Sequence, residues 1–333
     1  MKAYVIKRYG KNVALEVAEL QQPKVGEDDV LIEIHAAGLN VLDAKIRNGE
    51  FKLLLPYKLP LVLGHDLAGV VVNVGANVKR FKLGDEVYAR PADFHIGAFA
   101  EYIALNENDV AMKPNNITME EAASMPLVSL TAWQALVEKA KLSAGQKVFI
   151  QAGSGGVGTI AIQLAKHLGA TVATTTSKTN FDLVKRLGAD FVIDYKTEEA
   201  ETILHDYDVV LNSQDTESLK KSLAVLKPNG KLISISGPPD PSFADEIGAS
   251  WVVKLIMRLL SMSVRRRAQR LNVDYSLLFM KASGRQLSEI TALVSAGKIK
   301  PIVDRTFPFN AINEAMAYVE TGRAKGKVVI NIK

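Results

Sequence analysis

Cysteine is absent from the sequence of 333 residues. Its absence excludes disulfide bonds and every metal site built on thiolate ligands, and it fits a reducing compartment. Aromatic residues are few, at 7%, and the charges are mixed, so we expect no nucleic-acid partner. The first ten residues, MKAYVIKRYG, alternate like a β-strand and lack the apolar core of a signal peptide. We therefore expect a cytoplasmic protein.

Long blocks of like charge are also missing, with one exception. The 41 basic and 36 acidic residues give a net charge of +5 and are spread along the chain. The exception is the run Arg265, Arg266 and Arg267, with Arg258 and Arg270 nearby. It lies in the segment 251–270, WVVKLIMRLLSMSVRRRAQR, whose apolar positions are interrupted by Lys254 and Arg258. The segment therefore does not supply the roughly 20 mostly apolar residues of a transmembrane span. Two interpretations stay open: the solvated end of a packing helix, or a basic amphipathic surface that contacts a membrane, a partner or an anionic ligand.

A glycine cluster follows the apolar run 148–150 and precedes a segment with apolar residues at helical spacing. Gly153, Gly155 and Gly158 fit the pattern G-x-G-x-x-G between a strand and a helix. In this pattern the first glycine permits a sharp turn, the second permits close approach of a diphosphate, and the third permits close packing of the helix on the sheet. The start of the helix offers free N–H groups to phosphates. A merely structural turn is the alternative, but the strand and helix on either side favour a dinucleotide site.

The pattern of apolar residues divides the chain into two domains. Residues 1–122 contain short apolar runs separated by turn residues, which predicts a barrel-like β domain. Residues 123–281 alternate between strand and helix patterns, which predicts a parallel sheet covered on both faces. Its strands are expected at 147–152, 171–176, 191–194, 208–212 and 231–236. Residues 282–333 are too few for a core of their own, so we expect them to pack on the first domain.

Several motifs occur in a fixed order along the chain: AAGLNVLDAKIRNG, LGHDLAGVVVNVG, GDEVYA, AGSGGVG, LGADFVIDY and GRAKGKVVI. With these motifs the chain resembles the medium-chain dehydrogenase/reductase superfamily. Within it, the chain looks like the zinc-free branch of quinone oxidoreductases and NADPH-dependent alkenal/one oxidoreductases. The resemblance implies an α/β fold, a doubly wound Rossmann domain for NADPH (123–281) and a GroES-like β-barrel catalytic domain (1–122 with 282–333).

The resemblance also bears on metal binding. In zinc-dependent relatives a cysteine, a histidine in a GHE-type motif and a third ligand hold the catalytic zinc, and a loop of four cysteines holds a structural zinc. Here Asn40 stands at the first position, His65 remains, and the third position falls on or near Leu127. Zinc needs three protein ligands, so we predict no metal. A makeshift site of His65, Asp66 and Asp43 is the alternative.

The residues after the second Rossmann strand indicate the choice of cofactor. In NAD-binding sites an acidic residue about 20 positions after the glycine turn binds the ribose. Here the strand ends in ATTTSKTN, with hydroxyl groups and Lys178 but no acid before Asp182. Such groups favour the 2′-phosphate of NADPH. Together with the resemblance, these considerations assign cofactor binding to Asn40, Lys45, Thr131, Gly153, Ser154, Gly155, Gly156, Val157, Gly158, Thr176, Ser177, Lys178, Asn180, Tyr195, Asn212, Ser236, Gly237, Lys325, Gly326 and Lys327.

Without a metal, alcohol oxidation has no Lewis acid. The remaining chemistry is hydride transfer from NADPH to an electrophilic carbon of an enal, an enone or a quinone. Asn40, Lys45 and Tyr57 are candidate catalytic donors for the developing enolate charge. We expect an apolar rim around the substrate, formed by Leu53, Leu54, Leu55, Leu59, Leu61 and Phe94.

Two other functions stay open. An enoyl-thioester reductase of the same superfamily could use the arginines of 265–270 for a phosphate-bearing substrate. An NADPH-binding protein with a structural or nucleic-acid role is the other. The apolar segment around Tyr275 is expected to form a sheet edge, and such edges often pair across a two-fold axis, so we expect a homodimer.

Overall fold

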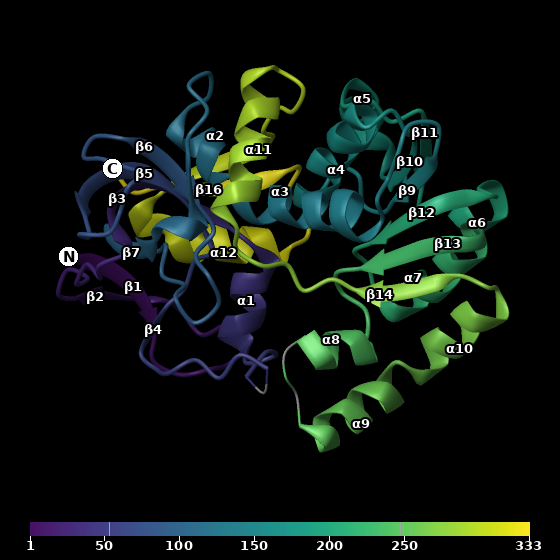
Figure 1. The fold of residues 1–333 in the computed structure, drawn as a ribbon, viewed down its shortest axis with the longest axis horizontal. Coiled ribbons are helices and arrows are strands. Elements are labelled where there is room, and N and C mark those ends of the chain that lie inside the picture. Colours follow the sequence, from purple (N-terminus) through teal and green to yellow (C-terminus); the bar gives the residue numbers. More distant parts are fainter. Residues whose placement is uncertain (53, 247, 249) are drawn as a thin grey trace. The chain divides into compact units, whose positions relative to one another are not determined.

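The computed structural model describes residues 1–333 except 53, 247 and 249. The chain forms two compact units, one of residues 1–130 with 281–333 and the other of residues 131–280 (Figure 1). Residues 123–130 thus lie in the first unit, whereas the second domain proposed from the sequence begins at 123. Among the described residues, no helix is both long enough and apolar enough to cross a membrane.

The first unit contains a seven-stranded sheet and a three-stranded sheet. The larger sheet has the order β15-β16-β3-β5-β6-β8, with β7 also paired to β3, and the smaller has the order β2-β1-β4. The strands are β1 (Lys2–Ile6), β2 (Glu16–Glu19), β3 (Asp29–Leu39), β4 (Leu61–Val62), β5 (Asp66–Val74), β6 (Glu86–Ala89), β7 (Tyr102–Asn106), β8 (Val110–Met112), β15 (Val303–Pro308) and β16 (Lys327–Asn331). β16 pairs antiparallel with β3, so the end of the chain packs on the first unit.

Short helices flank these sheets. They are α1 (Val41–Asn48), α2 (Met119–Ala123), the first turns of α3 (Pro126–Trp133), α11 (Gly284–Ser295), α12 (Ile312–Glu320) and single 3₁₀ turns at Glu107–Asp109 and Phe309–Ala311. α2 begins with a capping box, in which the Thr118 hydroxyl accepts from the Glu121 N–H while the Glu121 carboxylate accepts from the Thr118 N–H. α2 packs on β3 and β5, which explains why residues beyond 122 belong to the first unit.

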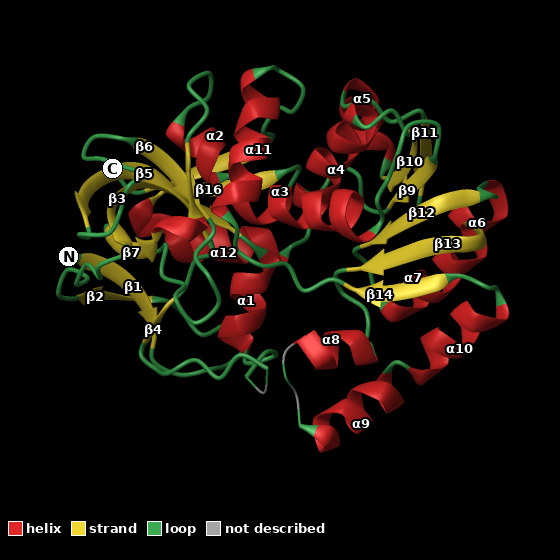
Figure 2. Ribbon diagram, viewed as in Figure 1, coloured by secondary structure: helices red, strands yellow, loops and turns green. Residues whose placement is uncertain are grey.

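The second unit is built on a six-stranded parallel sheet with the order β11-β10-β9-β12-β13-β14. Its strands are β9 (Lys147–Ile150), β10 (Thr171–Thr176), β11 (Phe191–Asp194), β12 (Tyr207–Asn212), β13 (Leu226–Ser234) and β14 (Asp274–Leu277). Its helices are α4 (Gly156–His167), α5 (Phe181–Arg186), α6 (Ala200–Ile203), α7 (Thr216–Ser222), α8 (Pro241–Glu246), α9 (Trp251–Leu260), α10 (Met262–Arg270), a π-helix at Gln134–Lys139 and 3₁₀ turns at Lys178–Asn180 and Leu223–Val225. Figure 2 shows these helices flanking the sheet. The order confirms the doubly wound fold and places β14 at the edge.

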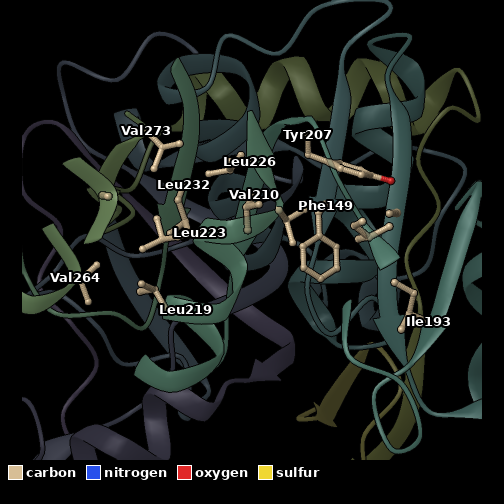
Figure 3. Close-up of a cluster of buried hydrophobic side chains, with 14 residues drawn as sticks. Phe149, Ile193, Tyr207, Val210, Leu219, Leu223, Leu226, Leu232, Val264 and Val273 are labelled. Atoms are coloured by element: carbon tan, nitrogen blue, oxygen red, sulfur yellow. The ribbon is translucent and has the colours of Figure 1, made fainter. Parts of the chain in front are cut away.

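The core of this sheet is made by aliphatic and aromatic side chains that pack with residues of α7 and α10. Phe149, Val210 and Leu232 come from three neighbouring strands and are buried together with Leu219 of α7 and Val264 of α10 (Figure 3). Continuous apolar strands of this kind are expected where both faces of a sheet are covered. The core fixes the carboxyl ends of β9, β10 and β12, where the candidate cofactor residues lie.

Candidate functional site

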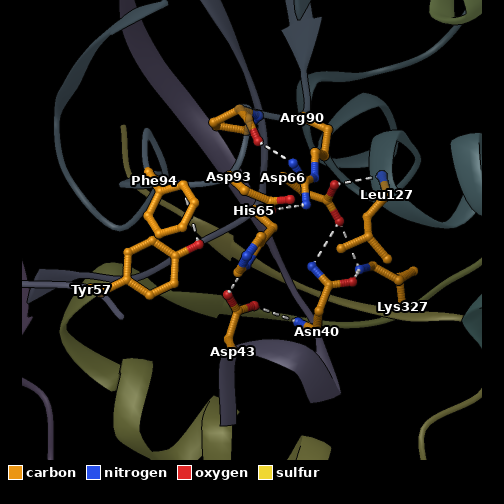
Figure 4. A network of polar contacts seen from close by, with 11 residues as sticks. Asn40, Asp43, Tyr57, His65, Asp66, Arg90, Asp93, Phe94, Leu127 and Lys327 are labelled. Atoms are coloured by element: carbon orange, nitrogen blue, oxygen red, sulfur yellow. Dashed lines mark hydrogen bonds and ion pairs between the residues drawn. The ribbon is translucent and has the colours of Figure 1, made fainter. Parts of the chain in front are cut away.

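A buried polar network occupies the first unit, where α1 begins after β3 (Figure 4). Asn40 precedes α1, and its backbone N–H donates to Asp43 Oδ2 over 2.8 Å. The Asn40 amide nitrogen donates to Asp66 Oδ2 at the start of β5, over 2.9 Å. A carboxylate in the first turn of a helix also complements the positive end of the helix dipole. The helix start therefore fixes both the backbone and the side chain of Asn40.

Lys327 completes this network from the last strand. Its ammonium group donates to Asp66 Oδ2 over 2.9 Å and also to Asn40 Oδ1. The second oxygen of Asp66 accepts the backbone N–H of Leu127 over 2.7 Å. Asp66, Asn40 and Lys327 are all buried, so the ion pair lies in a region of low dielectric, where removal of one partner is costly.

His65 and Asp43 form a second buried pair beside this network. His65 Nδ1 lies 2.6 Å from Asp43 Oδ1, and both side chains are buried. At this distance the ring N–H donates to the carboxylate. The other ring nitrogen, Nε2, is buried and has no hydrogen-bond partner among the described residues.

Two of the three predicted catalytic donors, Tyr57 and Lys45, form no side-chain hydrogen bond or ion pair with this network among the described residues. Tyr57 is buried, its ring packs 5.4 Å from that of Phe94, and its hydroxyl accepts the Phe94 N–H at 3.5 Å. Burial raises the pKa of Tyr57 to about 12, so its hydroxyl keeps its proton. Lys45 lies half-buried on α1. Of the predicted apolar rim, Leu55 is buried and Phe94 is exposed, whereas Leu53 lies outside the described residues.

The glycine turn of the second unit lies between β9 and α4. A Cβ on Gly153 would collide with the Thr174 hydroxyl oxygen on β10 and lie 2.9 Å from Cγ2 of the same side chain, and one on Gly158 would lie 2.7 Å from Gly153 Cα. The first and third glycines are thus required by close packing. A Cβ on Gly155 would meet only the carbonyl oxygen of Ala152, at 3.3 Å. Space therefore remains at the second glycine, where the pattern places a diphosphate.

Three predicted cofactor residues meet beside this turn. The Thr176 hydroxyl donates to Ser154 Oγ over 2.8 Å, and the Asn180 amide nitrogen donates to the same atom over 3.2 Å. Asn180 Oδ1 is buried and unpartnered among the described residues. Lys178 is exposed, and so is Tyr195, at 62%. Ser177 bonds Thr179 through its hydroxyl, so hydroxyl, amide and ammonium groups are gathered at the end of β10.

A second polar cluster lies at the ends of β12 and β13. Asn212 Nδ2 donates to Gln151 Oε1 over 2.6 Å, and the Ser234 hydroxyl donates to Asn212 Oδ1 over 2.6 Å. The Gly237 N–H donates to Ser234 Oγ, and Ser236 bonds Asn212 at 3.5 Å. Gln151 and Ser234 were not among the predicted residues, although each is a polar residue at the end of an apolar strand.

The remaining predicted cofactor residues occupy separate positions. Thr131 is buried at the start of the second unit. Gly156 and Val157 form the first turn of α4. In the first unit Lys325 is exposed, and Gly326 has a φ of +74° directly before β16.

Family models match most of the chain. Residues 26–115 match the alcohol dehydrogenase GroES-like domain, and residues 187–330 match the zinc-binding dehydrogenase model. The sequence is 36% identical to NAD(P)H oxidoreductase RTN4IP1, mitochondrial, of Mus musculus, over 100% of this chain and 89% of that protein. It is 38% identical to the chloroplastic NADPH-dependent alkenal/one oxidoreductase of Arabidopsis thaliana, over 99% and 79%. The quinone oxidoreductase of Coxiella burnetii has a similar structure, with a TM-score of 0.87, 30% identity and coverage of 100% and 99%.

The chain belongs to the medium-chain dehydrogenase/reductase superfamily. The relatives place it in the branch of quinone and alkenal oxidoreductases and confirm the GroES-like and Rossmann architecture. By their names these relatives are NAD(P)H-dependent oxidoreductases. The chain is therefore a member of an oxidoreductase family.

The donor set in this medium-chain dehydrogenase/reductase fits a metal poorly. Asp66 is engaged by the Lys327 ammonium, the Asn40 amide and the Leu127 N–H, and Asp43 is engaged by His65 and the Asn40 N–H. Within the part of the chain that the structure describes, no three His, Asp or Glu side chains are grouped as a metal site. A cationic ammonium on the central carboxylate opposes a second cation there. In the alternative metal site of His65, Asp66 and Asp43, the carboxylate oxygens are thus already engaged in hydrogen bonds and an ion pair.

Proposed function

We propose that this protein is a zinc-independent, NADPH-dependent reductase that delivers hydride to an electrophilic carbon of an α,β-unsaturated carbonyl compound or a quinone. The observation that carries the proposal is the ammonium of Lys327 on Asp66. The Lys327 ammonium supplies a fixed positive charge where a zinc-dependent relative would use a metal ion. An ammonium donates hydrogen bonds but does not generate an alkoxide from an alcohol as a metal does, so reduction of an activated double bond is favoured over alcohol oxidation.

The end of β10 supports NADPH as the cofactor. The last residue of β10 and the four that follow it, Thr176 to Asn180, offer hydroxyl, amide and ammonium groups and no carboxylate. A carboxylate would repel the 2′-phosphate, whereas an exposed lysine attracts it. The Arabidopsis relative is named as NADPH-dependent. When bound, NADPH supplies the hydride.

The residues of the chain then have separate tasks. We assign the diphosphate to the backbone of Gly155 and the start of α4, and the 2′-phosphate to Ser177 and Lys178. Asn40 retains a second amide hydrogen besides the one donated to Asp66. That hydrogen, the Lys45 ammonium and the protonated Tyr57 hydroxyl are the candidate donors to the oxygen that becomes negative when hydride adds to the β-carbon. The α-carbon then takes a proton from water, which completes the reduction.

The test is product analysis with a medium-chain 2-alkenal. The purified protein is incubated with NADPH or NADH, and the product is identified by mass spectrometry and NMR. We expect the saturated aldehyde, formed efficiently with NADPH. The variant Lys178→Ala is expected to raise KM for NADPH about tenfold, as one charged contact is worth roughly 1.5 kcal/mol or more, with little change for NADH. The matched control Lys196→Ala alters an exposed lysine after Tyr195.

Other outcomes discriminate between the parts of the proposal. An allylic alcohol would show hydride transfer to the carbonyl carbon and contradict it. Turnover of quinones but not of alkenals would restrict the substrate to quinones. Equal use of NADH would contradict the assignment of Lys178.

We also propose a homodimer and a cytoplasmic location. Among the described residues β14 pairs with a strand on one side only, so its other side offers backbone groups to a second copy. Light scattering gives the mass, and a monomer would contradict the dimer. The named relatives are mitochondrial and chloroplastic. Fractionation of the source cells tests the location, and recovery of the protein in an organelle fraction would contradict it.

A further inference from the structure

Helix α9 exposes an almost continuous apolar surface. Of its ten residues, Met257 alone is buried. Trp251, Leu255 and Leu259 are exposed by 77%, 49% and 57%. They recur every four residues and so form one stripe along the helix. Val252, Val253, Ile256 and Leu260 widen this stripe and are also exposed. A monomeric protein rarely leaves so large an apolar patch in water without a partner for it.

Basic residues border and follow this surface. The 23 residues from 251 to 273 contain six lysines and arginines and no acidic residue. Arg258 is exposed on α9, and Arg266, Arg267 and Arg270 are exposed on α10. Lys254 is paired with Asp245 at 2.6 Å. Among the described residues, none of the four exposed arginines has a carboxylate within ion-pair distance. The helix pair therefore combines an apolar stripe with unneutralised positive charge.

The helix pair is anchored to the unit through α10. Val264 and Ala268 of α10 are buried in the core of the parallel sheet. Ser261, between the two helices, is fully buried, and its hydroxyl donates to the Met257 carbonyl over 2.9 Å. Such a bond often bends a helix, and the structure divides the segment into α9 and α10 at this residue. α10 thus anchors α9, which directly precedes it in the chain (Figure 1).

We propose that α9 and α10 dock this protein on the surface of an anionic lipid membrane. Leucine, isoleucine and tryptophan on one side with arginines beside them are the composition of helices that lie in the interface of a bilayer. The ten residues of α9 are about half the length that a transmembrane helix needs, so α9 would lie along the surface. Arginine stems can cover lipid tails while the guanidinium groups reach the phosphates.

The charge pattern argues against a second copy as the occupant. A two-fold interface places the same patch on both partners. The exposed arginines of one copy would then face those of the other with no carboxylate from this segment between them. Like charges at close range weaken such an interface, whereas anionic lipid neutralises them.

The test is sedimentation with vesicles of phosphatidylcholine alone and of phosphatidylcholine with phosphatidylserine. We expect binding to the vesicles that contain phosphatidylserine and its weakening at high salt. The triple variant Arg266→Gln, Arg267→Gln, Arg270→Gln should lower the partition coefficient at least about tenfold, since each basic residue contributes roughly 1 kcal/mol. Leu255→Gln with Leu259→Gln should lower it at least about tenfold by removing apolar contact.

Matched variants remove the same chemistry elsewhere. Lys11→Gln with Lys24→Gln and Lys82→Gln removes three exposed charges of the first unit, and Leu83→Gln with Phe191→Gln removes two exposed apolar side chains. We expect both to bind vesicles like the unaltered protein. Circular dichroism and urea midpoints check that every variant is folded.

Three results would overturn the proposal. The first is no binding to phosphatidylserine vesicles. The second is an equal loss of binding in the matched variants. The third is conversion of a dimer to a monomer by Leu255→Gln with Leu259→Gln, because the stripe would then be covered by a second copy. The test needs no turnover, so its outcome is independent of the proposed reductase activity.

Discussion

Lys327 Nζ lies 2.9 Å from Asp66 Oδ2, and both groups are buried. This contact joins the last strand of the chain to β5 across 261 positions of sequence. It also determines the electrostatics of the network, because the same carboxylate binds the Asn40 amide and the Leu127 N–H.

Replacement of Lys327 by methionine should destabilise the first unit strongly. The Asp66 carboxylate would stay buried without its counter-charge, which costs about 3–5 kcal/mol. Urea unfolding followed by circular dichroism measures this loss. Lys327→Met with Asp66→Asn should cost less than the sum of the two single variants, by about 1 kcal/mol or more.

An exposed ion pair gives the control. Lys7 and Glu16 lie 2.7 Å apart on the surface, with more than half of each side chain exposed. Lys7→Met should therefore change the stability by about 1 kcal/mol or less. Additive effects of the Lys327 and Asp66 variants would show that their contact does not contribute to stability.

Local patterns in the sequence predict the strands and the glycine turn, but they do not predict the partner of Lys327. The glycine turn, the first five parallel strands and the sheet edge at β14 follow from local patterns, and the structure confirms them. The partner of Lys327 lies far away in the sequence, and no periodicity distinguishes the buried Lys327 from the exposed Lys325. In the same way, the pattern of 251–270 shows apolar and basic residues but not that almost the whole apolar side of α9 faces outward.

Removal of metal should leave the activity unchanged. The oxygens of Asp66 and Asp43 are already engaged by Lys327, Asn40, Leu127 and His65, which leaves too few ligands for zinc. We expect equal rates of NADPH oxidation before and after dialysis against a chelator, and no gain on addition of zinc. Elemental analysis that found one zinc per chain, with activity lost on chelation, would contradict the proposed chemistry.

Alkaline pH should destabilise the protein in part through Tyr57. Burial raises the pKa of Tyr57 to about 12 in the folded protein, against 10 for an exposed phenol. The unfolded chain therefore loses this proton first, so the stabilising contribution is complete below pH 10 and is lost as the pH rises to about 12. Tyr88 and Tyr275 contribute in the same direction, because burial raises their pKa as well.

The variant Tyr57→Phe isolates this contribution. Its urea midpoint should fall less steeply between pH 10 and about pH 12 than that of the unaltered protein. Tyr195→Phe removes an exposed phenol and serves as the control. Parallel curves for Tyr57→Phe and the unaltered protein would mean that the Tyr57 phenol is as accessible as a surface one.

Two alanine variants of the glycine turn should separate its structural role from its role in binding. In Gly158→Ala the new Cβ would meet the Ala152 carbonyl oxygen and lie 2.7 Å from Gly153 Cα. Backbone atoms cannot yield as a flexible side chain can, so we expect a loss of about 1–3 kcal/mol in unfolding free energy. In Gly155→Ala the nearest atom is 3.3 Å away and φ is −81°, which alanine adopts. Its stability should change by less than about 1 kcal/mol.

The affinity of the folded protein for NADPH should respond to the two variants in the opposite order, with the larger loss in Gly155→Ala. The Cβ of Gly155→Ala would occupy the space through which the diphosphate approaches the backbone, so we expect Kd for NADPH to rise at least about tenfold, a cost of roughly 1.4 kcal/mol. Fluorescence titration with NADPH measures Kd, and urea unfolding of the same sample measures the stability. Unchanged affinity in a stable Gly155→Ala protein would mean that the diphosphate does not bind at this turn, since the fold itself leaves that space open.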